Sequence, residues 1–391
     1  MVSGHNNNIM PNTCTGFAFL TSTSSRSGFS GSIKKQGAVL LRLLLLLAFL
    51  VGGALWMGYA HVQSLFSKPL EFPEGQYALD VLPGSSFSAV TRQFERDDLF
   101  PYPRLLAFYG RYFGYSRNLK AGEYAISSGS TMFDVLEILK SGAVVYHQLT
   151  LLEGQTFKVF RQQLLDTRNL RHDITELSDD DIMKKLGAEG MHPEGQFYPD
   201  TYFFQKNDSD FDMLQRAYRR LQGVLQEEWD NRVKEEQAGT LESLPYKTPY
   251  DALIMASIIE KETGQPRERP EIAAVFVQRL KKRMRLQTDP TVIYGLGERY
   301  QGNITKRHLR EKTPYNTYRI NGLPPTPIAS AGQAAINAAL HPTASTALYF
   351  VAKGDGSHKF SKTLKEHQKA VRQYQWKRKA NYRSAPASPL K

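Results

Sequence analysis

Three hydrophobic patterns follow one another along the chain. Residues 1–36 are poor in apolar side chains and rich in Asn, Ser and Thr, which predicts a disordered tail. The stretch Ala38–Ala60 is then almost continuously apolar and carries no charge from Leu43 onward. From about Pro69 the pattern changes to short alternating runs and amphipathic stretches, which predict the strands and helices of a folded body.

The continuous apolar stretch predicts a membrane anchor over residues 37–60. Its uncharged part is about as long as a bilayer core is thick. The alternative is a cleaved signal peptide, but the apolar region of such a peptide is shorter, roughly 7–15 residues. Trp56 and Tyr59 lie near the far end of the stretch, where aromatic rings favour the membrane interface. We therefore expect an anchor that is not removed.

Positive charge sets the expected orientation of this anchor. Lys34, Lys35 and Arg42 all lie on its N-terminal side, and such residues stay in the cytoplasm. Residues 1–36 are then a cytoplasmic tail, and everything after His61 lies outside the cytoplasm. The sequence thus predicts a single-pass protein of the inner (plasma) membrane with an extracytoplasmic body.

A small α+β unit is expected over residues 61–145. The run "LKAGEYAIS" alternates like a strand, and the following "SSGSTMFDVLEIL" has Ser130 or Thr131 as a candidate N-cap. Val135, Leu136 and Leu139 then fall at helical spacing. A strand followed by a capped helix is similar to the LysM type of glycan-binding module. The alternative is a spacer that holds the rest of the body away from the membrane.

Residues 146–245 are interpreted as a connecting region. Within it, Met191–Phe204 ("MHPEGQFYPDTYFF") is punctuated by Gly and Pro and rich in aromatic residues, so it is too irregular for a long helix. Its rings either form faces for sugar binding or pack ordinarily within a loop. The amphipathic stretch Phe211–Lys234 predicts a helix, and a following helix is expected to begin with Thr248 or Asp251 as its cap.

That next helix, expected from about Tyr250 to Thr263, ends in two glutamates. Ile254, Ile258 and Glu262 fall at intervals of four residues and therefore share one apolar face. Glu260 lies on a smaller and more polar face. Burial raises the pKa of a carboxyl group, which a general acid working near neutral pH requires. The periodicity therefore favours Glu262 as the catalytic candidate over Glu260.

Either glutamate could instead form an ion pair on a solvated face. Arg267, Arg269 and Lys261 are the nearby basic residues in the sequence. Glu260 in particular is expected to orient or pair with such groups, and it remains the secondary catalytic candidate.

Charge and cysteine content narrow the partner class. The net charge of +12 and the pI near 9.5 suit an anionic partner, such as nucleic acid, an acidic membrane face or a cell-wall polymer. Nucleic acid is disfavoured because the body is exported and carries no recognisable reader motif. The single cysteine, Cys14, rules out an intrachain disulfide. No histidine pair has the HExxH spacing, so we expect no metal site and no cofactor.

Two loop-rich segments supply the remaining candidates. Arg285–Gly297 and Thr313–Gly332 are dense in hydroxyl, amide and aromatic groups, which are suited to hydrogen bonding with sugar hydroxyls and N-acetyl groups. Farther on, "ALYFVAKGDGSHKFS" alternates around Gly354–Gly356, which predicts a β-hairpin. Residues 376–391 form a basic tail.

The runs "MASIIEKET", "RLQTDPTVIYGLGERY", "YNTYRINGLPP" and "LYFVAKGDGSHKFS" closely resemble the YceG-like family (MltG) of membrane-anchored endolytic murein transglycosylases. The segment "EGQFYPDTYFF" is similar to that family's "EG…PDTY" segment. The resemblance implies an α+β protein with an N-terminal transmembrane helix and a small LysM-like subdomain. A mainly helical, lysozyme-like catalytic domain with a C-terminal hairpin then occupies residues 246–375. Residues 1–36 and the basic tail depart from the simplest family pattern.

The resemblance implies non-hydrolytic cleavage of the β-1,4 bond between N-acetylmuramic acid and N-acetylglucosamine in nascent peptidoglycan, leaving 1,6-anhydro ends. Glu262, followed by Thr263, matches the family's catalytic glutamate and acts first as acid and then as base. The resemblance also implies a limit on glycan strand length and association with peptidoglycan synthases. Substrate-binding candidates implied in the same way are Gln287, Thr288, Asp289, Tyr294, Tyr315, Asn316 and Tyr318, each of which could instead stabilise a loop.

Two alternatives stay open at this point. If Asp289 faced Glu262 across the site at roughly 5–9 Å, a hydrolase with paired carboxylates would be possible. Because Pro290 follows it, Asp289 is more typical of a helix or turn cap. A non-enzymatic peptidoglycan-binding scaffold is the alternative from a different class of protein.

Overall fold

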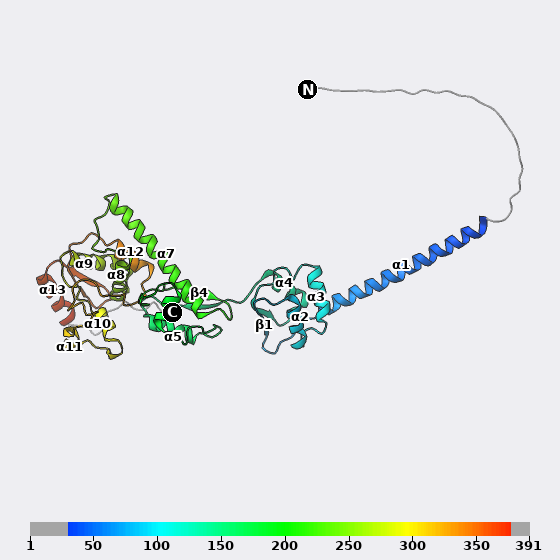
Figure 1. Cartoon of the computed structure of the whole chain (residues 1–391), viewed down its shortest axis with the longest axis horizontal. Helices are drawn as coiled ribbons and strands as arrows, with labels where there is room; N and C mark the ends of the chain where they lie inside the picture. Colours follow the sequence, from blue (N-terminus) through cyan, green and yellow to red (C-terminus); the bar gives the residue numbers. More distant parts are fainter. Residues whose placement is uncertain (1–29, 377–391) are drawn as a thin grey trace, which may run out of the picture. The chain divides into compact units, whose positions relative to one another are not determined.

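The computed structural model describes residues 30–376, and the side chains of residues 39–375. The predictions of a disordered N-terminal tail and of a basic C-terminal tail therefore lie almost wholly outside the described residues. Figure 1 labels the elements of the chain. The chain divides into two compact units. Within the described residues, one comprises residues 30–70 together with 129–134, and the other comprises residues 71–128 and 135–376.

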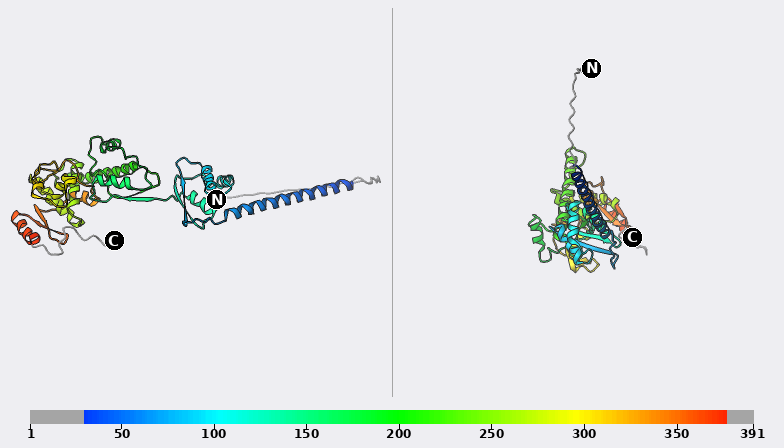
Figure 2. Two further views of the ribbon diagram at one scale, coloured as in Figure 1. Left: turned by 90° about the horizontal axis from the view of Figure 1, so that it is seen from below. Right: turned by 90° about the vertical axis from the view of Figure 1, so that its right-hand side faces the viewer.

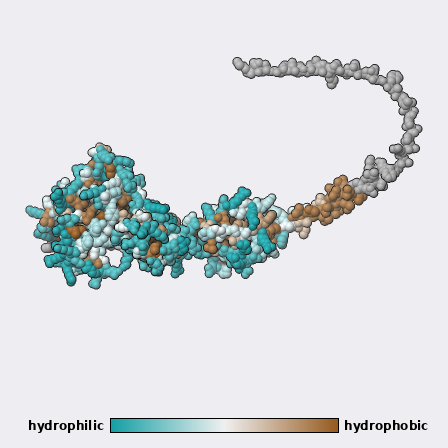
Figure 3. Space-filling view, viewed as in Figure 1, coloured by the Kyte–Doolittle hydropathy of each residue, from teal (hydrophilic) through white to brown (hydrophobic). Residues whose placement is uncertain are grey.

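The first unit is dominated by the long helix α1 (Ser30–Phe66). Its part from Val39 to Phe66 is long and apolar enough to cross a membrane, and the most apolar 18-residue stretch within it is not buried against the rest of the protein. Figure 3 shows hydrophobic residues gathered along this helix. The helix extends past the predicted end at Ala60. Its last residue, Phe66, is buried, with its ring centroid 5.3 Å from that of Phe133.

The second unit begins with a two-stranded antiparallel sheet. Strand β1 (Gln76–Val81) pairs with β2 (Gly122–Ser127), and α2 (Phe87–Arg96) and α3 (Pro103–Tyr112) lie between them in the sequence. Helix α4 (Met132–Ser141) follows, and its first three residues belong to the first unit. The predicted strand and capped helix are confirmed, since Thr131 Oγ1 accepts the Asp134 N–H at 3.3 Å. The element order is thus strand, two helices, strand and helix.

A hydrophobic core forms around the next antiparallel pair, β3 (His147–Thr150) with β4 (Thr201–Phe204). Helices α5 (Phe157–Asp166) and α6 (Asp179–Lys185) contribute to it. The Met191–Phe204 segment enters this core, because Phe197 is 1% exposed and stacks on Phe157 at 4.9 Å. The sequence left sugar binding and packing as alternatives for the aromatic rings of this segment, and the ring of Phe197 is used for packing.

A larger, helical core contains residues from both before and after residue 245 in the sequence. The long helix α7 (Asp210–Gln237) contributes Leu221 and Leu225 to the same cluster as α8 (Pro249–Glu262), α9 (Arg269–Lys281) and α12 (Gln333–Leu340). The predicted helix at Phe211–Lys234 is therefore confirmed, and it is longer by one residue at its start and by three at its end. Helix α12 packs on α7, α8 and α9. The division between a connecting region and a catalytic domain stays a prediction, and the proposed boundary falls within a shared core.

Short elements complete this part of the fold. Helices α10 (Asp289–Leu296) and α11 (Lys306–Arg310) lie in the loop-rich region. Strands β5 (Tyr349–Ala352) and β6 (His358–Ser361) pair antiparallel, which confirms the predicted hairpin. Helix α13 (Leu364–Val371) packs on both strands; these elements are orange to red in Figure 2.

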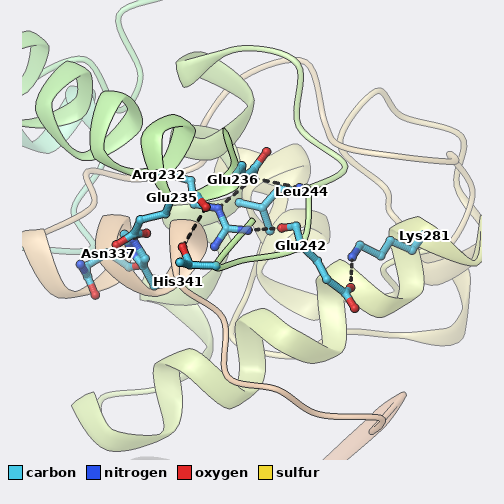
Figure 4. Close-up of polar contacts among 9 residues, drawn as sticks. Arg232, Glu235, Glu236, Glu242, Leu244, Lys281, Asn337 and His341 are labelled. Carbon is cyan, nitrogen blue, oxygen red and sulfur yellow. Dashed lines mark hydrogen bonds and ion pairs between the residues drawn. The ribbon is translucent and has the colours of Figure 1, made fainter. Parts of the chain in front are cut away.

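A polar cluster at the C-terminal end of α7 fixes this helix to its neighbours (Figure 4). Arg232 is only 4% exposed, donates to Glu236 at 2.8 Å and contacts the carbonyl oxygen of Glu242. His341, just past α12, lies 2.9 Å from a carboxylate oxygen of Glu235. Because α12 packs directly on α8, these contacts support the helix that carries Glu262.

Candidate active site

Glu262 is the last residue of α8. Thr248 caps the start of the helix in a reciprocal capping box with Asp251, which satisfies backbone N–H groups of the first turn. The residues that follow, 252–259, are all buried. At the other end Thr263 is already extended, with φ −145°, so the chain leaves the helix directly after Glu262. A helix that is apolar all round belongs in a core. Here it ends in a carboxyl group at the edge of that core.

Burial raises the pKa of Glu262 to about 7. A hydrogen bond from the Thr288 hydroxyl opposes the rise, the nearby carboxylate of Asp289 adds to it, and the guanidinium of Arg279 again opposes it. The side chain keeps partial contact with solvent. Glu262 can therefore hold a proton near neutral pH and still be reached from outside.

Thr288 is held in place by two further threonines. Its backbone N–H donates to Thr317 Oγ1 at 3.0 Å, and Thr317 Oγ1 lies 2.9 Å from Thr291 Oγ1. All three are 2% exposed or less. Such a satisfied buried network fixes the direction of the Thr288 hydroxyl toward Glu262. Of the three, only Thr288 is a candidate in the sequence analysis. The only sequence signal for Thr291 is its position three residues after Thr288, at the start of α10.

Arg279 is the cation beside Glu262, and sequence reasoning missed it. It projects from α9 with 7% exposure, donates to the carbonyl oxygens of Leu286 at 2.8 Å and Leu348 at 2.7 Å, and packs over the ring of Tyr349. An arginine inside the apolar run "AAVFVQRL" was the only hint. Its bonds to two distant carbonyl groups make it a fixed positive charge.

Asp289 and Tyr318 form a pair next to Glu262. The Tyr318 hydroxyl donates to Asp289 Oδ1 at 2.7 Å. Burial, followed by the charge of Asp289, raises the pKa of Tyr318 above its usual value. Thr288 occupies the N-cap position of α10 and Asp289 is the first residue of the helix, so Asp289 lies in a helix start, as its Pro neighbour indicated.

Tyr294, near the end of α10, lies against Tyr315. Their rings meet edge to face at 4.8 Å, and the Tyr315 hydroxyl lies 2.9 Å from Thr326 Oγ1. Tyr294 also reaches Glu194, whose pKa burial raises to about 7 and whose carboxylate accepts the Phe157 N–H at 3.0 Å. Glu194 belongs to the "EGQF" segment but was not predicted as a site residue. It is a second buried carboxyl group in this region.

Gln287 and Asn316 take different positions. Gln287 is exposed and adopts φ +53°, a left-handed conformation that non-glycine residues rarely adopt. Asn316 is 1% exposed; its amide donates to the Glu311 carbonyl at 2.6 Å and its Oδ1 accepts the Tyr318 N–H at 3.0 Å. The Asn316 side chain is thus committed to holding the loop that carries Tyr318.

Glu260 faces away from this group. Its side chain is 5% exposed and accepts from Arg269 at 2.6 Å and from the Gly332 N–H at 3.2 Å. Burial raises its pKa, and the charge of Arg269 opposes that rise. Glu260 is therefore paired with one of the basic residues that the sequence offered.

No group of three or more His, Cys, Asp and Glu side chains is placed to hold a metal ion within the described part of the chain. His341 and His358 each lie against a single glutamate, Glu235 and Glu268 respectively.

Comparison with known proteins gives a consistent set of similarities. Residues 79–373 match the profile of the YceG-like family. A Bacillus subtilis (strain 168) protein named endolytic murein transglycosylase is 32% identical over 342 residues, covering 83% of this chain and 91% of that protein. A protein of the same name from Streptococcus pneumoniae (strain D39) is 25% identical, and the match covers 65% of its length. A crystal structure of a yceG-like protein from Listeria monocytogenes is similar with a TM-score of 0.49 and 30% identity, covering 76% of this chain and 99% of that one.

Proposed function

Because the chain belongs to the YceG-like family, we propose that it is a peptidoglycan lytic transglycosylase whose catalytic residue is Glu262. The named relatives support the activity. The observation that supports the residue is a carboxyl group at the end of α8 with a pKa of about 7, held by the Thr288 hydroxyl. A general acid works best when its pKa lies near the operating pH.

The proposed reaction uses this one carboxyl group twice. Glu262 first gives its proton to the glycosidic oxygen, and the bond from that oxygen to C1 of N-acetylmuramic acid breaks. Positive charge then develops on the sugar ring as an oxocarbenium-like transition state. The C6 hydroxyl of the same sugar attacks C1 and its proton goes to the Glu262 carboxylate. The products are an N-acetylglucosamine end and a 1,6-anhydro end, no water is consumed, and Glu262 is protonated again.

The surrounding groups take distinct proposed roles. Thr288 orients the carboxyl group of Glu262, and Arg279 stabilises its carboxylate form after the first proton transfer. Substrate contact is proposed for the exposed or half-buried candidates, Gln287, Asp289, Tyr294, Tyr315 and Tyr318. For Asn316 we propose support of the Tyr318 loop in place of substrate contact, because its amide is used by backbone groups.

The apolar helix α1 is proposed as a single-pass anchor in the plasma membrane. Residues 1–36 would lie in the cytoplasm and the body outside it, where peptidoglycan is made. Cleavage of nascent strands at that place would limit glycan strand length, and synthases of the same polymer are the proposed neighbours.

Glycan strands without peptide substituents provide the test. The full chain in detergent is incubated with such strands, and the new ends are identified by mass spectrometry. We expect anhydro ends with the natural chain and none with Glu262→Gln, while binding of strands is retained. Ends heavier by one water would mean hydrolysis and would exclude the proposed mechanism. Unchanged cleavage by Glu262→Gln would exclude the residue, and absence of cleavage in the natural chain would favour a binding scaffold.

A further inference from the structure

Helix α3 exposes a group of aromatic side chains. Phe108 is 69% exposed, Tyr112 is 74% and Phe113 is 53%, and Tyr102 just before the helix is 48% exposed. Three of these rings touch, with centroid distances of 6.2 Å for Phe108–Tyr112 and 4.9 Å for Tyr112–Phe113. Single exposed aromatic residues are ordinary on protein surfaces, whereas a contiguous set of them marks a contact surface.

Arginines interleave with these rings. Phe108 follows Arg104 by four positions, Arg111 follows Phe108 by three and Tyr112 follows it by four, so these side chains share one face of the helix. Arg104 and Arg111 also line a groove of about 920 Å³ between α2 and α3, together with Arg92. Glu95 is the one acidic residue among the lining residues. Among the described residues no ion pair involves any of these three arginines, and Arg111 donates only to Ser88 Oγ, at 2.8 Å.

We propose that this aromatic–arginine face (Tyr102, Arg104, Phe108, Arg111 and Tyr112, with Phe113 at its edge against Tyr112) docks on the anionic phospholipid surface of the membrane that α1 crosses. The inference rests on the proposed role of α1 as an anchor. Tyrosine and phenylalanine rings favour the interfacial region of a bilayer, and a basic amphipathic helix binds there through both apolar and charged contacts. The planar guanidinium group matches the geometry of a lipid phosphate.

The position of α3 in the sequence adds a second reason. α1 ends at Phe66 and α3 begins at Pro103. A face joined by so short a chain to a membrane-crossing helix meets the lipid surface at a high effective concentration, so even weak contacts suffice for docking.

A glycan is the competing occupant, and the lining chemistry favours lipid. Sugar hydroxyl and N-acetyl groups are bound by hydroxyl, amide and aromatic side chains, and the amides supply a donor and an acceptor together. The groove contains no Asn or Gln among its lining residues. The groove instead has three arginines and one acidic residue, Glu95, beside exposed rings.

The test uses the full chain reconstituted in lipid nanodiscs. Cys14 is replaced by Ser, and an environment-sensitive fluorophore is attached at Phe113→Cys, or at Lys234→Cys on α7 as the control position. In discs containing phosphatidylglycerol we expect a blue shift of the label at position 113 and quenching by spin-labelled lipid. In discs of phosphatidylcholine alone, or at high salt, both signals should fall because the arginines lose their partners or are screened.

Matched substitutions separate this face from general surface effects. Phe108→Ser with Tyr112→Ser should abolish the quenching. Tyr146→Ser with Phe203→Ser should leave it unchanged, since these two aromatics are similarly exposed, at 60% and 58%, but lie outside the face. Arg104→Gln should reduce the ratio of docked to undocked chain by about fivefold, which corresponds to about 1 kcal/mol per basic residue at an anionic surface.

Three results would overturn the proposal: no quenching at position 113 in anionic discs, equal quenching in neutral discs, or loss of quenching in the Tyr146 and Phe203 control. A response of the label to soluble glycan strands in neutral discs, without a response to anionic lipid, would identify a glycan site instead. Cleavage of soluble strands is measured on the same samples. Loss of docking with cleavage retained concerns this proposal alone, and loss of cleavage with docking retained concerns only the proposed function.

Discussion

At the scale of single residues, the protonation of Glu262 sets the expected pH dependence. Its pKa of about 7 lies well above that of an ordinary glutamate because the group is buried. The proposed first step needs the protonated form, so kcat/KM should be level below pH 7 and fall about tenfold per pH unit above it. A rate measured on soluble strands from pH 5 to pH 9 checks this. A rate that rises through neutral pH would mean that the ionised form starts the reaction.

Thr288 should move that profile. Its hydroxyl donates to Glu262 and so stabilises the carboxylate form. Thr288→Val keeps the shape but removes the donor, which should raise the pKa of Glu262 and shift the falling limb upward by about one pH unit. Thr201→Val, which also removes a hydroxyl hydrogen bond, on β4, is the control and should leave the profile in place. A purely structural role for Thr288 would lower the rate at every pH without moving the limb.

At the scale of elements, the turn at Gly195 holds the "EGQF" segment against the loop that follows the Tyr315 region. Gly195 has φ +73°, and a Cβ there would lie 2.4 Å from the Cβ of Pro327. Gly190 has a similar φ of +80° with open space around it. Gly190→Ala should therefore cost only backbone strain, about 1–2 kcal/mol, and Gly195→Ala clearly more. Denaturant midpoints of the two variants compare them, and equal midpoints would show that the contact with Pro327 yields easily.

Local signals in the sequence were enough to predict several elements. Three features each depend only on residues that are close together in the sequence. They are the cap of α8, the Gly-Asp-Gly turn of the hairpin and the apolar face that ends in Glu262. The groups that shift the pKa of Glu262 come instead from other elements of the chain. Arg279 comes from α9, and Thr288 comes from the residue before α10. Periodicity within one element carries no information about such partners, because only tertiary packing brings them together.

At the scale of the whole molecule, long-range hydrogen bonds join the predicted connecting region to the predicted catalytic domain. The Gly154 N–H donates to the Ser330 carbonyl at 2.9 Å, the Ser330 N–H donates to the Gln155 carbonyl at 2.8 Å, and Lys261 Nζ donates to the Gly154 carbonyl at 3.0 Å. Backbone groups have no residue-specific signal, so this junction could not be predicted. It attaches the segment before α5 to the end of the helix that carries Glu262.

The shared helical core therefore predicts how fragments of the body behave. Leu221 and Leu225 of α7 are buried in the same cluster as Leu253 and Ile254 of α8. A fragment of residues 246–375 would expose that apolar surface to water and lose the junction at Gly154, so it should not unfold cooperatively and should not cleave strands. A fragment of residues 146–375 keeps both and should unfold cooperatively and retain cleavage. Thermal unfolding followed by circular dichroism, with strand cleavage on the same samples, compares the two. Cooperative unfolding and activity in the shorter fragment would show that the contribution of α7 to the core is dispensable.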